Sequence, residues 1–149
     1  MSRMRTLSIL LLSLGFAPLP VAAGHEMEDR NLLRGAELYQ NNCAACHGVN
    51  LEGQPDWQVA GPDGVLPAPP HDETGHTWHH DNGLLFDYTR LGGQAALAMR
   101  GITGFRSGMP AFEGTLSDDE IWDVLAYIRS TWPDRVQTVQ AARNPPHED

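Results

Sequence analysis

The chain of 149 residues contains no lysine, so all ten of its Lys/Arg positions are arginine. Against them stand 19 Asp and Glu residues, which give a formal net charge of −9 at pH 7. This balance disfavours nucleic-acid binding, because contacts to phosphates require a basic surface, and it disfavours anionic lipid for the same reason. The acidity leaves two interpretations open: attraction to partner proteins with a basic docking surface, or simple solubility.

The sequence also lacks an apolar run long enough to span a bilayer. The longest run, from Leu7 to about Phe16, is shorter than the roughly 20 residues that a spanning helix needs, and two prolines close it. Two arginines precede it and small residues follow, which is the order of a secretory signal peptide. We predict that residues 1–23 are cleaved after Ala23 and that the mature chain has no stable membrane insertion. Loss of the two arginines would take the net charge of −9 to −11.

Only two cysteines are present, Cys43 and Cys46, and His47 directly follows the second. A Cys-x-x-Cys-His sequence is the attachment motif of a c-type haem. The two thiols bond to the vinyl groups of the porphyrin, and the imidazole supplies an axial ligand to the iron. The motif therefore predicts one haem c, bound covalently through Cys43 and Cys46 and ligated by His47.

Two other interpretations of the cysteine pair stay open. A redox disulfide would have no need of His47, and no strand-rich βαβ pattern surrounds the motif. A structural zinc site usually has four Cys or His ligands, and no further cysteine exists. The histidines that could complete such a site are His71, His76, His79 and His80.

Apolar periodicity predicts several helices. One covers about residues 30–45 and ends in the haem motif, a second covers about 82–91 with Asp81 as its N-cap, and 94–100 adds another turn or two. A final helix begins at Ser117, and Pro133 stops it. We expect one domain over residues 24–133, followed by a polar and flexible tail over 134–149.

The N-terminal end of the final helix carries a specific signal. Ser117 and Glu120 have the spacing of a capping box, and Leu116 could pack against Ile121. The stretch from about 49 to 75 is instead crowded with glycine and proline, which predicts an irregular loop. A loop of this length is uncommon in a small domain unless it has a function, such as wrapping a cofactor.

A haem held by His47 needs a ligand on its other face, and Met109 is the candidate. It lies between glycine-containing turns, ahead of the final helix, and Pro110 favours an extended backbone before it. A thioether opposite histidine raises the reduction potential of the iron. Met99, in contrast, is expected to be a buried filler of a helical turn.

These features together resemble the class I c-type cytochromes, which are small mono-haem electron carriers. The resemblance covers about residues 32–132 and rests on three motifs in order. Gly35-x-x-x-Tyr39, ahead of the Cys43–His47 motif, is similar to the first helix of the family. Residues 109–112, Met-Pro-Ala-Phe, are similar to its methionine loop, and residues 124–127 to its C-terminal helix.

The resemblance implies an all-α fold of three to five helices wrapped around one haem, with the Pro/Gly-rich loop after the haem motif. It implies that Gly35 lets the first helix approach the last one near Val124 and Tyr127. It also implies that one haem edge is exposed for electron exchange and that the haem is attached outside the bacterial cytoplasm. The expected location is therefore the periplasm.

Two further residues are assigned through this resemblance. The Pro-rich stretch at 67–70 occupies the place where the family uses a proline carbonyl to accept a hydrogen bond from the axial histidine; we assign this role to Pro69, with Pro67 or Pro70 as alternatives. Trp78 is similar to the family tryptophan whose indole N–H reaches a haem propionate. A simple core role for Trp78 is the competing interpretation.

The segment that contains His71, His76, His79 and His80 departs from a generic carrier. A polar cover over the propionates is the favoured interpretation. An exposed loop and a site for copper or another metal are the alternatives.

The predicted function is one-electron transfer without catalysis, either as a free carrier or as the haem subunit of an exported oxidoreductase. In both cases the partners are redox proteins, and the chain is a monomer or part of a complex. Two alternatives remain: a haem enzyme or gas sensor in which Met109 is displaceable, and a His-rich metal-binding protein without haem.

Overall fold

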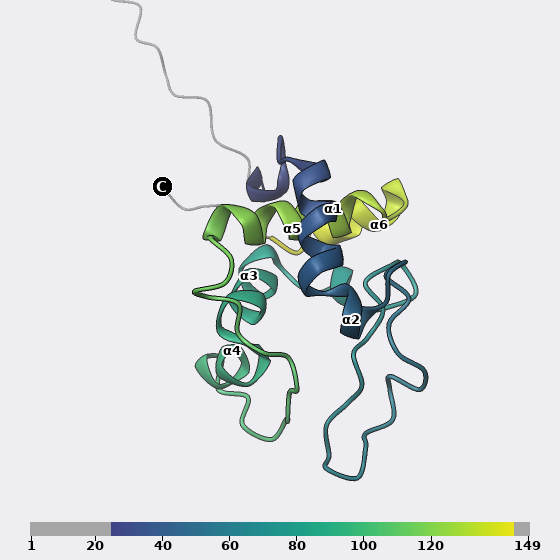
Figure 1. Cartoon of the computed structure of the whole chain (residues 1–149), viewed down its shortest axis with the longest axis vertical. Coiled ribbons are helices and arrows are strands. Elements are labelled where there is room, and N and C mark those ends of the chain that lie inside the picture. The colour runs from purple at the N-terminus through teal and green to yellow at the C-terminus, as the bar shows by residue number, and fades with distance from the viewer. Residues whose placement is uncertain (1–24, 145–149) are drawn as a thin grey trace, which may run out of the picture.

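The computed structural model describes residues 25–144. The expected signal peptide, residues 1–23, lies outside this range. Within this range the regular elements are helices, and the one β interaction is an isolated bridge between Glu113 and Leu116. The helices are η1 (His25–Met27), α1 (Leu32–Asn42), α2 (Ala44–His47), η2 (Thr77–His79), α3 (Asn82–Leu91), α4 (Gly93–Met99), α5 (Asp118–Ser130) and α6 (Asp134–Ala141). Figure 1 shows their arrangement. The predicted all-α class is confirmed, with six α-helices in residues 25–144 where three to five were expected.

The core lies where α1 crosses α5, the most extensive contact between helices in the described residues. α1 buries Leu38 and Tyr39 in it, and α5 buries an apolar stripe of residues spaced three and four apart: Ile121, Val124, Leu125 and Ile128. This spacing places their side chains on one face of the helix. None of the helices in residues 25–144 has the length and apolar character required to cross a bilayer.

The predicted capping box fixes the start of α5. The Ser117 side chain accepts a hydrogen bond from the Glu120 amide at 3.3 Å, and the Glu120 carboxylate accepts one from the Ser117 amide at 3.0 Å. Glu120 also pairs with Arg34 of α1 at 2.8 Å. Through Glu120, the capping box therefore links the N-terminal end of α5 to α1.

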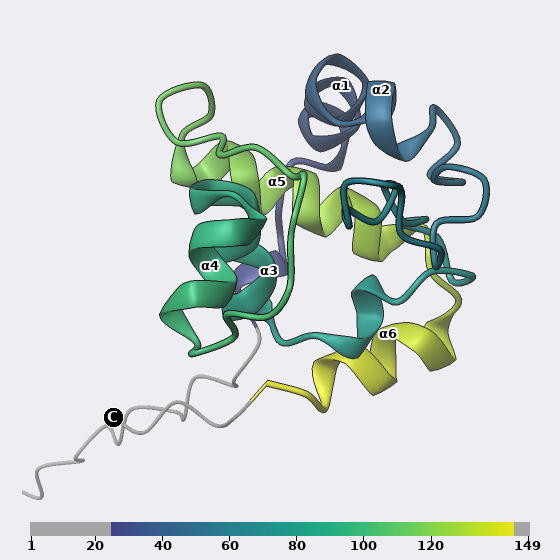
Figure 2. The same cartoon turned by 90° about the horizontal axis from the view of Figure 1, so that it is seen from below.

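The helices α3 and α4 form a second layer beside α5 (Figure 2). Asp81 caps α3 as expected, accepting a hydrogen bond from the Leu84 amide at 2.7 Å. The prediction that Met99 fills the core was wrong, because its side chain is 70% exposed. Only Gly93 and Ala96 are buried on this short helix, and Met99 is its last residue.

The prediction of a flexible tail from residue 134 was wrong for residues 134–141, which form α6. Pro133, with φ −58°, immediately precedes the helix, and this φ is compatible with helix initiation. Val136 and Gln140 are buried, and the Gln140 amide donates to the Asn82 side chain at 2.8 Å. Because the segment is mostly polar, its sequence did not indicate that one face of the helix is buried. Residues 145–149 lie outside the described range.

The stretch between α2 and η2 is irregular, as the glycines and prolines predict. It folds back on α2 through main-chain hydrogen bonds, from the Gly53 amide to the His47 carbonyl at 2.7 Å and from the His71 amide to the Leu51 carbonyl at 2.8 Å. Gly53 has φ +70°, and a Cβ there would lie 2.4 Å from the Pro70 nitrogen. The turn therefore requires glycine, and it brings the proline-rich stretch against the haem motif.

Candidate functional site

The Cys-x-x-Cys-His motif forms a single helical turn of its own. The expected helix over 30–45 ends at Asn42, and Cys43, with φ −115° and ψ −37°, separates α1 from α2. Because Cys43 and Cys46 are three residues apart across this turn, their side chains can reach the same side of it. Both thiols are unpaired; Cys43 is buried and Cys46 is exposed. Burial raises the pKa of the Cys43 thiol to about 11.

His47 is buried at the end of the same turn, with 7% of its surface exposed. Its Nδ1 lies 2.9 Å from the Pro69 carbonyl oxygen, which can only accept, so this nitrogen carries the proton. That tautomer leaves Nε2 as the atom with a lone pair for a metal. Burial lowers the pKa of His47, and the Pro69 hydrogen bond partly opposes this shift. The neutral imidazole, which is the form that binds metals, is therefore favoured.

The Pro69 carbonyl is held in place by its neighbours. The Gln54 amide donates to the Ala68 carbonyl at 2.9 Å. Gly75 packs so tightly that a Cβ on it would lie 2.0 Å from the Pro70 oxygen. Of the three prolines considered, the structure places the Pro69 carbonyl at His47, and rigid contacts on either side support it.

Met109 lies on the segment between α4 and α5, with its side chain half-buried. Its carbonyl accepts a hydrogen bond from the Gly93 amide at 3.1 Å, and its amide donates to the Ser107 hydroxyl at 3.2 Å. Tyr88 in turn donates to Ser107 at 2.8 Å. In both cartoon views this segment runs between α4 and the loop that follows α2 (Figures 1 and 2).

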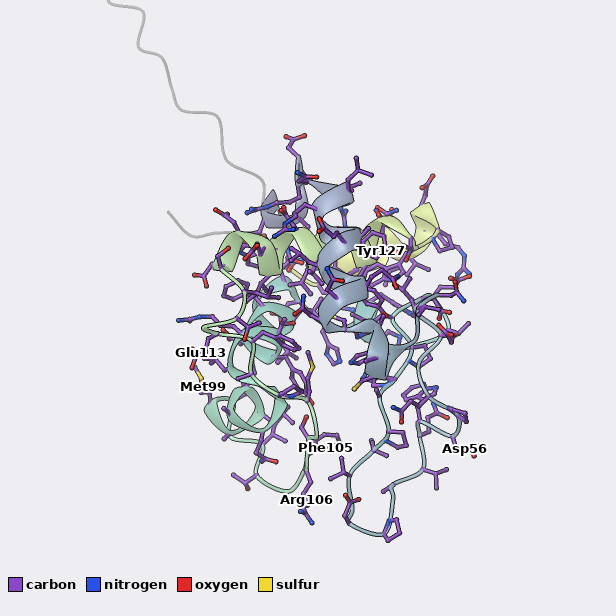
Figure 3. All side chains as sticks on the ribbon, in the orientation of Figure 1. Asp56, Met99, Phe105, Arg106, Glu113 and Tyr127 are labelled. Atoms are coloured by element: carbon purple, nitrogen blue, oxygen red, sulfur yellow. The ribbon has the colours of Figure 1, made fainter. Side chains whose placement is uncertain are left out.

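The Met109 segment also touches the loop after α2 directly. Arg106, labelled at the lower end of the molecule in Figure 3, donates to the Asp63 carbonyl. A Cβ on Gly108 would lie 3.0 Å from the Val65 side chain. The structure thus gathers Cys43, Cys46, His47 and Pro69 at α2 and brings the chain that carries Met109 up to the same loop.

The two tryptophans near the site have different partners. The Trp78 indole N–H donates to the Glu73 carbonyl at 3.3 Å, and its ring packs edge-on to His79 at 3.8 Å. The Trp132 indole N–H donates to the His71 carbonyl at 2.7 Å. No sequence motif indicated the Trp132 hydrogen bond, because it joins a residue just after α5 to a loop 61 positions earlier in the sequence.

The histidines at 71, 76, 79 and 80 lie near one another, but their rings have different stacking partners. His71 stacks on His47, with ring centroids 3.9 Å apart and planes 18° apart. His76 stacks on Trp57 at 5.2 Å and lies edge-on to His80, whereas His79 is exposed. Among residues 25–144, no three His, Cys, Asp or Glu side chains are grouped to hold a metal ion. The geometry therefore gives no support to a zinc or copper site in this segment.

The donor atoms fit a haem c. Two thiols one turn apart match the two vinyl groups of a haem, and the adjacent imidazole has Nε2 available, so it could ligate the iron. A thioether is available on a separate segment that reaches the same loop. A four-ligand zinc site would need further Cys or His side chains at the motif, and the described residues group none there.

Comparison with known proteins agrees with this donor set. The chain is 31% identical over 108 residues to the cbb3-type cytochrome c oxidase subunit CcoP of Azospirillum sp. (strain B510), covering 72% of this chain and 31% of that protein. It is 27% identical over 100 residues to cytochrome c6 of Diacronema lutheri, covering 67% of this chain and 95% of that protein. No solved structure gives a significant match.

The comparison with protein families covers most of the chain. The family model described as cytochrome c matches residues 32–132, the range that contains the Cys43–His47 motif and Met109. Members of this family bind haem c covalently, and Cys43 and Cys46 have the spacing that this attachment requires. The chain belongs to the cytochrome c family.

Proposed function

We propose that the protein is a one-electron carrier of the periplasm, with a haem tethered by Cys43 and Cys46 and ligated by His47 and Met109. The observation that carries this proposal is the contact of 2.9 Å between His47 Nδ1 and the Pro69 carbonyl oxygen. His47 directly follows Cys46, the second of the two unpaired cysteines. The contact with Pro69 fixes the tautomer that an axial ligand needs.

The bound haem supplies an iron that changes oxidation state by one electron. The protein's part is to hold that iron in a fixed environment. The Pro69 carbonyl orients His47 and increases its basicity as a donor. Hydrogen bonds to Ser107 and from Gly93 anchor the backbone of Met109, which supports a constant position of its sulfur in both oxidation states. If His47 and Met109 both ligate the iron, no position would remain on it for a substrate, and the chemistry that the haem would supply is electron exchange.

The relatives suggest two settings for such a carrier. One is a cytochrome c6, and the other is a subunit of a cytochrome c oxidase, of which this chain spans about a third. A free carrier would be monomeric, whereas a subunit would co-purify with an oxidoreductase. The acidic chain, with a net charge of −9, suits partners with basic docking surfaces, and salt would weaken their attraction.

The test is to produce the full chain in a host that exports proteins and matures c-type cytochromes. Periplasmic recovery, a haem content of one per chain and a pyridine haemochrome spectrum typical of two thioether bonds are expected. A near-infrared sulfur-to-iron band in the oxidised protein, and no rapid binding of carbon monoxide by the reduced protein, would support Met109 as ligand. Rapid and complete carbon monoxide binding would contradict the carrier and support a gas-binding or enzymatic role.

A further inference from the structure

We infer that His71 is a positioning residue that sets the ring plane of His47, and with it the electronic state of the iron that His47 binds. This inference rests on the proposed haem ligation by His47. It concerns a histidine outside the attachment motif, whose contact with the axial ligand neither the motif nor the composition indicates.

The first observation is the stacking geometry. The rings of His71 and His47 lie with centroids 3.9 Å apart and planes 18° apart, which is close, nearly parallel contact. At this distance the facing atoms of two flat rings are near their optimal van der Waals separation, so tilting either ring out of parallel would press some atoms into repulsive contact. The face of His71 therefore restricts the plane that His47 can adopt.

The second observation is that His71 itself is held firmly. Its amide donates to the Leu51 carbonyl at 2.8 Å, and its carbonyl accepts from the Trp132 indole at 2.7 Å. The ring of Tyr39 meets the ring of His71 at 5.9 Å with an angle of 63° between planes. Tyr39 is fully buried and donates to the Gly48 carbonyl at 3.0 Å. Contacts from α1 and from the end of α5 thus support the stacked ring.

The third observation is that Pro69 and His71 belong to one short stretch. The Pro69 carbonyl holds Nδ1 at the edge of His47, and the His71 ring covers its face. A single hydrogen bond at the edge leaves the ring free to tilt, because hydrogen bonds tolerate a broad range of angles. Edge and face restraints together define both the position and the plane of the imidazole.

The fourth observation is the state of the nitrogen atoms of His71. Its Nδ1 is buried and has no hydrogen-bond partner in the described structure. A leucine would fill the space without an unsatisfied nitrogen, so the use of a histidine here is not explained by burial alone. The flat face that stacks on His47 is what an aliphatic side chain would not supply.

The plane of an axial imidazole matters because it determines which iron d orbital interacts with the ligand π system. In an oxidised low-spin haem this orientation sets the anisotropy of the iron g-tensor and the distribution of unpaired spin over the four ring methyls. Axial-ligand orientation and the groups around the ligand are also levers on reduction potential. These quantities report on His47 directly and do not depend on any partner protein.

The experiment compares the oxidised holoprotein with three variants: His71→Leu, His71→Phe and His79→Leu. His71→Leu removes the flat face, and His71→Phe keeps a flat face without nitrogen. His79→Leu is the matched control, because His79 is exposed in the same segment and its ring contacts Trp78 instead of His47. The readouts are electron paramagnetic resonance, the proton resonances of the haem methyls and the reduction potential.

We expect His71→Leu to shift the largest g value, to reorder the haem methyl resonances and to move the potential, whereas His71→Phe stays close to the parent protein and His79→Leu matches it. Unchanged g values and methyl order in His71→Leu would overturn the inference. If His71→Leu does not mature with haem, the comparison of His71→Phe with His71→Met replaces it. Only the methionine variant, which lacks a flat ring, should then change the g values and the order of the haem methyl resonances. If His47 is found not to ligate the haem iron in the unmutated protein, the proposed function itself fails, and this outcome is distinct from failure of the inference about His71.

Discussion

The α-carbon of Gly35 lies directly against the main chain of Asp123. A Cβ added to Gly35 would stand 2.1 Å from the Asp123 carbonyl oxygen and 2.9 Å from the Tyr127 Cβ. Figure 3 shows Tyr127 of α5 beside α1 at this crossing. The two helices therefore approach as closely as their backbones permit, and the position of α2, which follows α1, depends on this approach.

Replacement of Gly35 by alanine should destabilise the protein. The obstacle is backbone, so α1 and α5 would have to move apart, and overpacking of this kind costs about 1–3 kcal/mol. Thermal or denaturant unfolding of the holoprotein would measure the loss. Gly104→Ala is the matched control, because a Cβ there meets nothing within 4 Å and its φ is not in the left-handed region. Equal stability of the two variants would contradict the close crossing.

The helices that carry this crossing could be predicted because their signals are local. The apolar stripe of α5, its capping box and the Asp81 cap of α3 are all encoded within a few residues. The resemblance predicted that Gly35 approaches the helix that is now α5, and the contact with Tyr127 confirms this. The sequence did not show that the closest atom belongs to the Asp123 backbone, since side-chain type says little about carbonyl positions.

The errors concern elements whose environment is set by distant parts of the chain. α6 has a polar sequence, but its Gln140 is only 1% exposed because it docks on residues at the start of α3. Met99 has the apolar character of a core residue, yet α4 presents it to solvent. In both cases hydrophobicity was a poor guide, because tertiary contacts decide which face is covered.

Replacement of Gln140 by alanine should destabilise the docking of α6. Its amide donates to the Asn82 side chain at 2.8 Å and to the His80 carbonyl at 3.2 Å. Loss of both leaves buried acceptors unsatisfied, which costs about 1–3 kcal/mol. Hydrogen exchange of α6 amides and denaturant unfolding would report the effect. Val139→Ala, at a half-exposed position on the same helix, should change the free energy of unfolding by less than about 0.5 kcal/mol.

The candidate site likewise has one part that the sequence predicts and another that only the fold reveals. The cysteine pair and His47 form a contiguous motif that sequence alone identifies. The choice of Pro69 among three prolines, and the stack of His71 on His47, depend on how the loop after α2 folds back, and the spacing of residues does not encode that path. The four histidines are near one another in space as well as in sequence, but their stacking partners, which the sequence does not indicate, differ: His47 for His71, Trp57 for His76 and Trp78 for His79.

Replacement of Met109 by alanine tests the second axial ligand. The variant should lose the near-infrared sulfur-to-iron band, bind carbon monoxide stoichiometrically when reduced, and have a lower reduction potential, because methionine opposite histidine raises it. Met99→Ala is the matched control, since Met99 is 70% exposed and Figure 3 shows it on the outer side of α4. A Met109 variant with the parent spectrum, or a Met99 variant with the altered one, would contradict the assignment.

The stability of the protein should fall as the pH drops below about 6.5, the ordinary pKa of histidine. Burial lowers the pKa of His76, and nearby His79 lowers it further; His71 and His80 also lie close to it. The unfolded chain therefore binds more protons at this position than the folded chain, so acid favours unfolding. The contribution is present above pH 6.5 and is lost as the pH falls through the lowered pKa of the folded state.

Denaturant unfolding of the holoprotein at a series of pH values from 7.5 to about 5 would measure this effect. The His76→Leu variant should lose less of its free energy of unfolding over that range than the parent protein does, because one proton-uptake site of the unfolded chain is gone. His79→Leu, which removes an exposed imidazole from the same segment, should keep most of the pH dependence. A His76 variant with the full slope would mean that the Trp57 stack does not hold this imidazole in its neutral form.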